Sequence, residues 1–177
     1  MSNLKQLTME HHKSAERCGF VKVLMSGSIN PVVYGTFLLN QYHKYSALES
    51  IALERGLLNG IESIQRADKI LADATELLLH TNIDLLESTS KYVKHIQTLN
   101  DHDLFAHIYV HHMGDLSGGQ MIKKRVPGKC TMYDFDGDVN EIKDQIRSRC
   151  KDSMAQEAKM CFDFAIKQFN EMTQLTA

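Results

Sequence analysis

The sequence predicts an all-α protein, folded as one bundle-like domain over residues 1–177. Apolar residues recur three and four positions apart along almost the whole chain, which is the spacing of one face of a helix. No stretch shows the alternation of polar and apolar residues that is typical of a half-buried strand. Only two prolines, Pro31 and Pro127, occur in the chain, and so few prolines favour long helices.

Four helices are expected in the first half of the chain. The first begins at Leu4 and should end near the sequence MSGS. Asn30 and Pro31 then form a helix start, because a capping side chain followed by proline at the first helical position is typical of one. This second helix should be long. After a break in the sequence LLNGIES, two further helices are predicted over about 63–79 and 82–98.

The second half contains one long irregular loop between two helices. The sequence LNDHDLF is another capped helix start, and the helix that follows it carries Gly114, Gly118 and Gly119. The loop VPGKCTMYDFDGDVN separates this helix from a last one, straight or bent, over about 139–173.

The composition excludes several classes of protein. A net charge of −2 gives no reason to expect binding to nucleic acid or to a membrane surface. No segment approaches the roughly 20 apolar residues that span a bilayer, and the N-terminus lacks the apolar run of a signal peptide. We therefore expect a soluble, cytoplasmic protein. Its cysteines show no C-x-x-C pair and no zinc-finger spacing, so reduced thiols are expected; they are Cys18, Cys130, Cys150 and Cys161.

The most unusual stretch is HHMGDLSGGQ, residues 111–120, which places three glycines in a segment with helical flanks. Each glycine costs about 1 kcal/mol relative to alanine inside a helix. The interval from Gly114 to Gly119 matches that of a phosphate-binding loop. That motif continues with lysine and then serine or threonine, however, whereas Gln120 and Met121 follow here. No strand precedes the stretch either, so we exclude a phosphate loop.

As a helix, the same stretch presents a face with almost no side chains. Gly114 and Gly118 are four residues apart, and Asp115 and Gly119 lie one step further round. Such a face allows either a flat molecule to approach the backbone or a second helix to pack closely. Asp115 favours the first alternative, because a helix-packing face seldom keeps an unpaired carboxylate. A kink is also expected here.

Two groups of histidines could bind a metal. His107 and His111 are four residues apart and could ligate one ion, although neither His-Glu-x-x-His nor Glu-x-x-His occurs in the chain. His12 precedes Glu16 by four residues, and a nearby carboxylate can orient a neutral imidazole that binds haem iron. Each histidine taken alone is more often structural than a ligand.

Five segments follow one another along the chain: HHKSAE, YHKYSALE, YVHHMGDLSGGQMIKK, IKDQIRSR and EAKMCFDFAIKQFNEM. In this order they resemble the proximal helix, the second helix, the distal helix, the propionate-binding basic run and the closing helix of the haem oxygenase family. The resemblance covers most of the chain and implies that family's helical fold, with haem held between a proximal helix and a kinked distal helix.

The resemblance also implies roles for individual residues. His12 would ligate the haem iron and Glu16 would orient it. Gly114 and Gly118 would line the distal face, and Asp115 would hold water near bound oxygen. The remaining positions match a tyrosine of the distal network, Tyr45, and the residues that contact the haem propionates, Lys5, Tyr109, Lys143 and Arg147.

The sequence departs from the family pattern at several places. The animal-type pattern has arginine two residues after Tyr109, where this chain has His111, and Ala165 stands where an asparagine is expected in the closing helix. The chain also looks trimmed around 58–64 and 126–138, and it lacks a C-terminal membrane tail. These features resemble the compact soluble forms of bacteria, algae, cyanobacteria and their phages.

The implied function is oxidative opening of haem at the α-meso carbon to biliverdin IXα, with release of carbon monoxide and ferrous iron. Haem is then both substrate and prosthetic group, and dioxygen is the second substrate. No flavin or nicotinamide motif is present, so electrons should come from a small ferredoxin, and we expect the chain to act as a monomer. A basic cluster could bind an acidic partner or be only a solvated face; it comprises Lys123, Lys124, Arg125 and Lys129, with Arg149 and Lys151 as further candidates.

Two other classes of function remain open. A non-catalytic haem carrier or sensor would share the axial ligand but would not need Asp115. The other class is a different metal or cofactor enzyme on a helical fold, such as a di-iron oxidase or a thiaminase-like hydrolase. The absence of Glu-x-x-His argues against the oxidase, and the absence of a cysteine beside an obvious base argues against the hydrolase.

Overall fold

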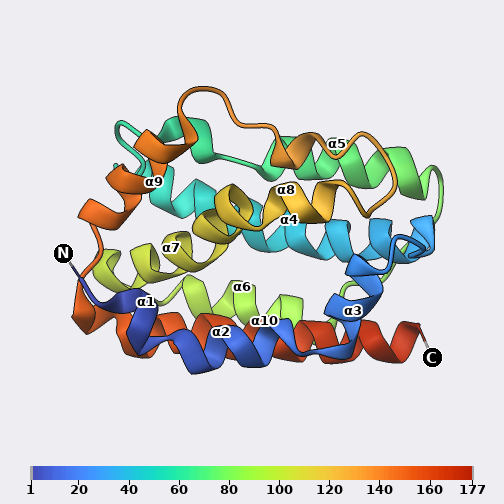
Figure 1. Cartoon of the computed structure of the whole chain (residues 1–177), viewed down its shortest axis with the longest axis horizontal. Coiled ribbons are helices and arrows are strands. Elements are labelled where there is room, and N and C mark those ends of the chain that lie inside the picture. The colour runs from blue at the N-terminus through green and yellow to red at the C-terminus, as the bar shows by residue number, and fades with distance from the viewer. Residues whose placement is uncertain (1, 177) are drawn as a thin grey trace.

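The structure, a computed structural model, describes residues 2–176, and every regular element in that range is a helix (Figure 1). The α-helices are α1 (Leu4–Leu7), α2 (Met9–Glu16), α3 (Gly19–Met25), α4 (Pro31–Glu54), α5 (Ala67–Leu78), α6 (Glu87–Ile96), α7 (Asp101–Ser117), α8 (Gly119–Lys123), α9 (Val139–Ser148) and α10 (Ala155–Leu175). Three short 3₁₀ turns lie between them, η1 (Glu62–Ile64), η2 (Thr131–Tyr133) and η3 (Asp152–Met154). The prediction of an all-α fold is confirmed.

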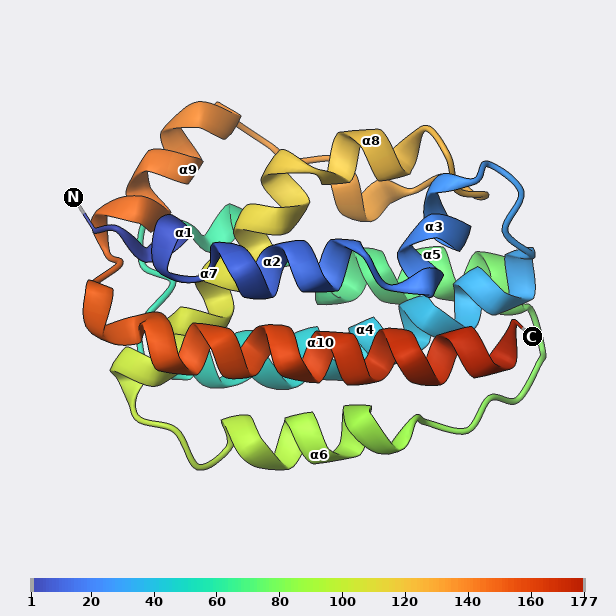
Figure 2. The same ribbon diagram turned by 60° about the horizontal axis from the view of Figure 1, so that its bottom comes forward.

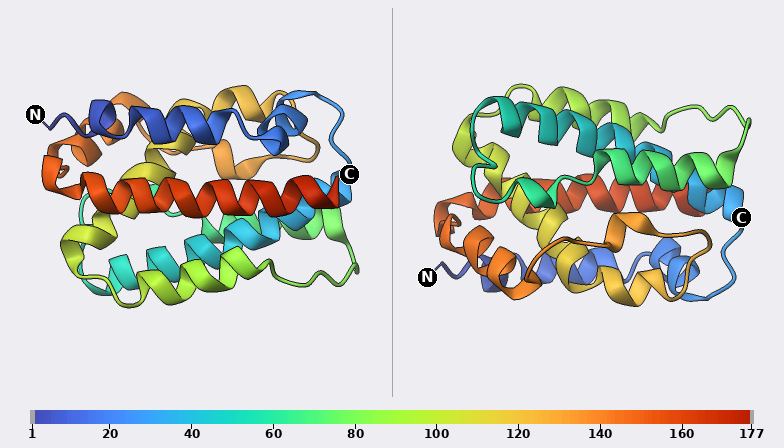
Figure 3. Two further views of the ribbon diagram at one scale, coloured as in Figure 1. Left: turned by 90° about the horizontal axis from the view of Figure 1, so that it is seen from below. Right: turned by 90° about the horizontal axis from the view of Figure 1, so that it is seen from above.

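The long helices lie beside one another in layers. Helix α10 lies between α2 and α6 and contacts both (Figure 2). Helix α4 pairs with α5 along the opposite side, and α7 runs obliquely across the molecule (Figure 3). Because α2 and α7 come from distant parts of the sequence, a site formed between them depends on this arrangement.

The buried apolar residues form two clusters, and α4 contributes to both. Leu48 of α4 packs in one cluster with Ile108 of α7, and Leu38 of α4 packs in the other with Phe20. Burying such side chains contributes roughly 1.5–3 kcal/mol each, which fixes α4 and α7 relative to each other.

Two helix starts lie where the sequence places them. The side chain of Asn30 accepts hydrogen bonds from the amides of Val32 at 2.9 Å and Val33 at 3.3 Å, directly before Pro31. Asn100 likewise accepts a hydrogen bond from the amide of Asp103 at 2.8 Å. Both starts were predictable because the capping side chain lies next to the helix that it caps.

The prediction of one helix from Leu4 to the sequence MSGS is wrong, because this segment forms three helices, α1, α2 and α3. At the first break, the hydroxyl of Thr8 donates to the carbonyl of Leu4 at 2.8 Å, a bond typical of threonines that disturb helices. At the second, Cys18 adopts an extended conformation with ψ 143°. The breaks let α2 turn one face toward α7 and the other toward α10.

Helices α5 and α6 begin several residues later than predicted, because side chains from distant segments cap them. Glu49 of α4 accepts hydrogen bonds from the amides of Arg66 at 2.7 Å and Ala67 at 3.0 Å, where α5 begins. At the start of α6, Asn40 accepts from the amide of Leu86 at 3.0 Å. The predicted range of 82–98 begins at Asn82, and both Asn82 and Asp84 lie before the helix.

The prediction of one last helix over 139–173 is also wrong, because the segment forms two separate helices, α9 and α10. The chain becomes extended at Lys151, with φ −131° and ψ 149°. Beside this break, the guanidinium of Arg149 donates to the carbonyls of Leu57 at 3.0 Å and Asn59 at 2.6 Å. These bonds fix the segment between α9 and α10 against the loop that follows α4, so that the two helices run in different directions.

The expected kink in the glycine-rich helix is present. Helix α7 ends at Ser117 and α8 begins at Gly119, so Gly118 alone separates them. The amide of Gly118 still donates to the carbonyl of Gly114 at 2.8 Å. Among residues 2–176, no helix combines the length and the apolar character needed to cross a bilayer.

Candidate active site

A cavity of about 640 Å³ opens between α2 and α7 and is closed by the N-terminal segment, α9 and α10. This volume lies in the range of cavities that hold a cofactor. The lining residues are Ser2, Leu4, Lys5, Thr8, His12, Glu16, Tyr109, Val110, Met113, Gly114, Ser117, Gly118, Arg147, Cys150 and Phe162.

His12 and Glu16 form one wall of this cavity. Nε2 of His12 lies 3.0 Å from Oε1 of Glu16, and the imidazole ring stacks on Phe162 with its centre 5.7 Å away. A neutral imidazole that donates to Glu16 from one nitrogen keeps a lone pair on the other, and turning the ring over exchanges the two. His11 does not line the cavity, since it points toward Asp163, 3.8 Å away. The imidazole available in the cavity is therefore that of His12.

The opposite wall is backbone of α7 around Gly114 and Gly118. A Cβ atom added at Gly114 would meet nothing within 4 Å, and one added at Gly118 would meet only the carbonyl oxygen of Gly114, at 3.6 Å. Gly119 does not belong to this bare face, contrary to the expectation. A Cβ atom there would lie 2.8 Å from Cε1 of Tyr133, because the break at Gly118 turns the next residue into the core.

Asp115 and Tyr45 lie behind the glycine wall and do not line the cavity themselves. The Tyr45 hydroxyl, in α4, donates to Oδ2 of Asp115 at 2.7 Å. Burial raises the pKa of Asp115 to about 6, although the hydrogen bond from Tyr45 opposes the shift. Burial and the neighbouring carboxylate hold the pKa of Tyr45 well above its usual range, so the hydroxyl stays a donor.

The four residues expected at the haem propionates are not all at the cavity. Lys5, Tyr109 and Arg147 line it, and the guanidinium of Arg147 also lies 3.2 Å from Asp144. Lys143 is half-buried on α9 and does not line the cavity. Two cationic side chains therefore stand at the cavity, on α1 and α9.

A buried polar cluster, not predicted from the sequence, lies beside these residues. The ammonium of Lys44, 2 % exposed, donates to Oε1 of Gln168 at 2.6 Å and lies 4.9 Å from the centre of the Tyr92 ring. The Tyr92 hydroxyl lies 3.0 Å from Nε2 of His111, whose ring is 5.1 Å from that of Tyr45. Burial lowers the pKa of Lys44 to about 8, and burial followed by the Lys44 charge holds the pKa of His111 well below its usual range.

This cluster bears on both departures from the family pattern. Where an arginine is expected, the chain has the neutral His111, but Lys44 supplies a cation in the same region. Ala165 replaces an expected asparagine, but Gln168, one helical turn later in α10, supplies a carboxamide. The sequence gives no signal for this cluster, because a lysine is ordinarily assigned to the surface, whereas α4 buries residues around most of its circumference.

His107 and His111 do not form the two-histidine metal pair that their spacing allows. The Tyr92 hydroxyl lies between them, 2.8 Å from Nδ1 of His107 and 3.0 Å from Nε2 of His111. His107 turns its other nitrogen toward Glu157 of α10.

The residues of the cavity fit haem. The donor set offers an imidazole oriented by a carboxylate on one side, which is how axial histidines are held. The open space beyond Gly114 leaves room for a flat ring against the backbone, and Lys5 and Arg147 can pair with carboxylates.

Comparisons with known proteins identify the family. The family model described as "Heme oxygenase" matches residues 1–171. A curated "Heme oxygenase 2" of Synechocystis sp. is 31% identical over 83% of this chain and 70% of that protein. A "Heme oxygenase" of Pyropia yezoensis is 27% identical over 97% of this chain and 84% of that protein.

Two solved structures share the fold. Heme oxygenase-1 of Synechocystis sp., solved in complex with heme, superimposes with a TM-score of 0.84 at 25% identity, over 95% of this chain and 89% of that one. The heme oxygenase of Leptospira interrogans gives a TM-score of 0.83 at 26% identity, over 95% of this chain and 97% of that one. The family match over nearly the whole chain, together with a cavity whose walls fit haem, establishes that this chain belongs to the haem oxygenase family.

Proposed function

We propose that this chain opens haem at the α-meso carbon to biliverdin IXα, releasing carbon monoxide and ferrous iron, with electrons from a ferredoxin. The observation that carries the proposal is the pairing of the two walls. His12 with Glu16 faces a bare backbone at Gly114, and Asp115 is the next residue of the same helix.

Haem, when bound, supplies both the iron that binds dioxygen and the ring that is cleaved. Residues of the chain hold it in place. His12 would offer its imidazole to the haem iron, and Glu16 accepts a hydrogen bond that keeps this imidazole oriented. The glycine wall leaves no side chain between the haem face and the backbone, so only a small ligand and water fit there.

Asp115 is suited to hold and move a proton beside that face. With a pKa of about 6, its carboxyl group exists in both protonation states near neutral pH. Tyr45 donates to Oδ2 and so fixes the carboxyl group, which leaves Oδ1 to hold water.

The in-plane orientation of haem would come from the cations at the cavity. Lys5 and Arg147 can each pair with one propionate, and the Tyr109 hydroxyl adds a hydrogen bond. Holding the propionates would restrict the in-plane rotation of haem, which supports a single biliverdin isomer. Arg147→Ala should therefore produce a mixture of isomers, measured by chromatography of the products.

Electrons would enter from an acidic ferredoxin bound at the exposed cations Lys124, Arg125 and Lys129. These three are exposed, whereas Lys123 pairs with Asp134 and Arg149 is bonded to backbone carbonyls. Opposite charge speeds the encounter of electron-transfer partners. The double variant Lys124→Glu/Arg125→Glu should turn over more slowly than the parent with ferredoxin but not with ascorbate. If the double variant and the parent turn over equally fast with ferredoxin, the docking site lies elsewhere.

We further propose that the chain acts as a monomer in the cytoplasm, where its thiols stay reduced.

The central experiment is reconstitution with haemin, followed by ferredoxin, its reductase and NADPH. Loss of the Soret band with growth of biliverdin absorption supports the proposal. An unchanged Soret band supports a non-catalytic haem carrier, and failure to form a Soret complex excludes both the enzyme and the carrier.

His12→Ala should abolish ligation of the haem iron, whereas His11→Ala, its matched control, should not. Asp115→Ala should bind haem normally but give little biliverdin, and a normal yield would remove Asp115 from the mechanism.

A further inference from the structure

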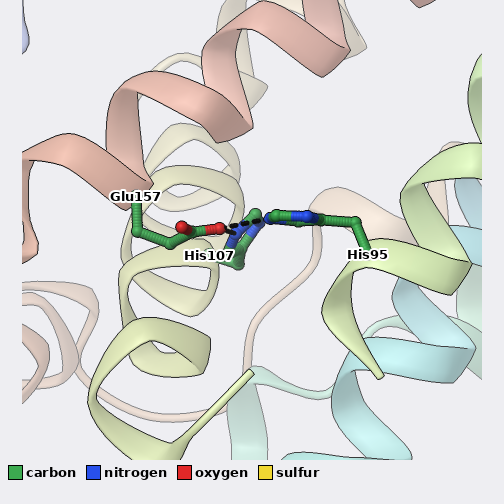
Figure 4. Close-up of side chains that lie close together, drawn as sticks. All are labelled: His95, His107 and Glu157. Atoms are coloured by element: carbon green, nitrogen blue, oxygen red, sulfur yellow. Dashed lines mark hydrogen bonds and ion pairs between the residues drawn. The ribbon is translucent and has the colours of Figure 1, made fainter. Parts of the chain in front are cut away.

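Three ligand-type side chains meet at a point that the haem cavity does not include. His95 of α6, His107 of α7 and Glu157 of α10 place three ligating atoms within 4.8 Å of one another, and Figure 4 shows both imidazoles turned toward the carboxylate. Oε1 of Glu157 lies 2.5 Å from Nε2 of His95 and 2.8 Å from Nε2 of His107. None of the three lines the cavity that contains His12.

The hydrogen bonds behind His107 bear on what lies between these atoms. The Tyr92 hydroxyl is 2.8 Å from Nδ1 of His107 and 3.0 Å from Nε2 of His111, and it has one proton to donate. When Tyr92 donates to His111, it accepts the N–H of His107 Nδ1, and a neutral His107 then turns the lone pair of Nε2 toward Glu157. A lone pair and a carboxylate oxygen at 2.8 Å repel each other, so a positive charge, carried either by a proton or by a metal ion, must lie between them.

We propose that this charge is a divalent transition-metal ion and that His95, His107 and Glu157 form a metal site suited to Zn²⁺. Two imidazoles and one carboxylate are a donor set that Zn²⁺ and other first-row divalent ions prefer, with a fourth position left for water. Mg²⁺ and Ca²⁺ prefer sites made of oxygen atoms and should not compete.

The surroundings of the three residues suit this role. Zinc bonds of about 2.1 Å in a tetrahedral site separate ligand atoms by about 3.3 Å. The ligands therefore need to move apart by less than 1 Å from their 2.5 and 2.8 Å separations. His107 is fully buried and held by Tyr92, the outer-shell bond that orients a metal-binding imidazole. The side chains of His95 and Glu157 are 21% and 11% exposed, so they can move outward and admit both the ion and a water ligand.

Zinc titration of the haem-loaded chain by calorimetry tests the site, because bound haem occupies His12. We expect one Zn²⁺ per chain and a thermal midpoint that rises with Zn²⁺ but not with Mg²⁺. His95→Ala and Glu157→Gln should each weaken binding by at least about 100-fold, since each removes a ligand. His102→Ala is the matched control: His102 also pairs with a carboxylate, Asp103 at 2.8 Å, but no third ligand joins them, and Zn²⁺ affinity should not change.

Three further measurements separate Zn²⁺ binding at this site from folding defects and from haem binding. His95→Gln keeps the size of a partly exposed side chain, so it should fold and still lose the ion. Haem-free His12→Ala protein should bind Zn²⁺ as tightly as the haem-loaded chain, and Zn²⁺-soaked crystals should show anomalous scattering between the three side chains. Equal Zn²⁺ affinity in the parent, His95→Ala and Glu157→Gln chains, or no Zn²⁺ binding by the parent, would overturn the proposal and leave a triad that shares protons only.

Discussion

Gly114 and Gly119 lie in the same glycine-rich stretch, and the same substitution should have opposite effects at the two positions. A Cβ atom at Gly114 would meet nothing within 4 Å, whereas one at Gly119 would lie 2.8 Å from Cε1 of Tyr133 and closer still to Cδ1. Tyr133 is buried, at 4 % exposed, so its ring has little room to retreat. Gly114→Ala and Gly119→Ala therefore form a matched pair.

The magnitudes follow from these contacts. Gly114 lies inside α7, where alanine is favoured over glycine by about 0.5–1 kcal/mol, so Gly114→Ala should stabilise the haem-free protein by that amount. Gly119 is the first residue of α8 and gains less, while overpacking against Tyr133 costs about 1–3 kcal/mol. The free energies of unfolding of the two variants should thus differ by roughly 2–3 kcal/mol.

Haem affinity should fall in the stabilised variant, Gly114→Ala, and stay unchanged in the destabilised one, Gly119→Ala. The new methyl group of Gly114→Ala occupies space against which haem packs, so affinity should fall by roughly tenfold, which corresponds to about 1.4 kcal/mol. Gly119→Ala leaves the cavity unchanged and should bind haem normally. Urea denaturation of the haem-free proteins and haemin titration at the Soret band measure the two quantities. If both variants are destabilised, or if both bind haem equally, the two glycines do not have the separate roles described here.

Three further perturbations test other parts of the site. Asp115→Asn should stabilise the haem-free protein at pH 7.5 by up to about 3 kcal/mol, since the folded-state pKa of Asp115 is raised from 3.8 to about 6. That advantage should vanish below about pH 4, because the parent keeps this stability in full below 3.8 and loses it as pH rises from there to about 6. Urea denaturation across this pH range measures the difference, and a pH-independent difference would contradict the prediction. Arg147→Ala should weaken haemin binding more than Lys143→Ala, because only Arg147 lines the cavity, and equal titration curves would count against propionate pairing there. Glu49→Ala should lower the free energy of unfolding by about 3–5 kcal/mol, since it strands buried His112 and two amides of α5; a loss under 1 kcal/mol would be inconsistent with this role.

The sequence predicts helix starts where the capping residue is local. Asn30 and Asn100 cap the helices that directly follow them, and both starts are correct. The starts of α5 and α6 are wrong because their amides are bound by Glu49 and Asn40, which belong to α4. A local pattern contains no information on which distant carboxylate or amide will reach a helix end, so such boundaries depend on the tertiary fold.

The same distinction applies to the site. His12 and Glu16 are four residues apart in one helix, and the helix itself converts that spacing into a contact of 3.0 Å. The bond between Tyr45 and Asp115 joins residues 70 positions apart, and no spacing rule relates them. Family resemblance named both residues, but only the packing of α4 against α7 gives Asp115 its buried partner and raised pKa.

The burial of Lys44 could not be predicted from the sequence, because a charged lysine side chain prefers water. A pattern of polar and apolar residues assigns a lysine to the surface, and lysine is almost never fully buried without a partner. Burial lowers its pKa from 10.5 to about 8, a net cost of roughly 3 kcal/mol for keeping the charged form, even though the ammonium donates to Gln168 and lies over the Tyr92 ring. An apolar side chain would fill the same space without this penalty. Patterns of polar and apolar residues predict positions at which each side chain has its preferred environment. They therefore fail for a charged side chain that is buried against its preference for water. Here that side chain, Lys44, lies in the polar cluster beside the Tyr45–Asp115 pair.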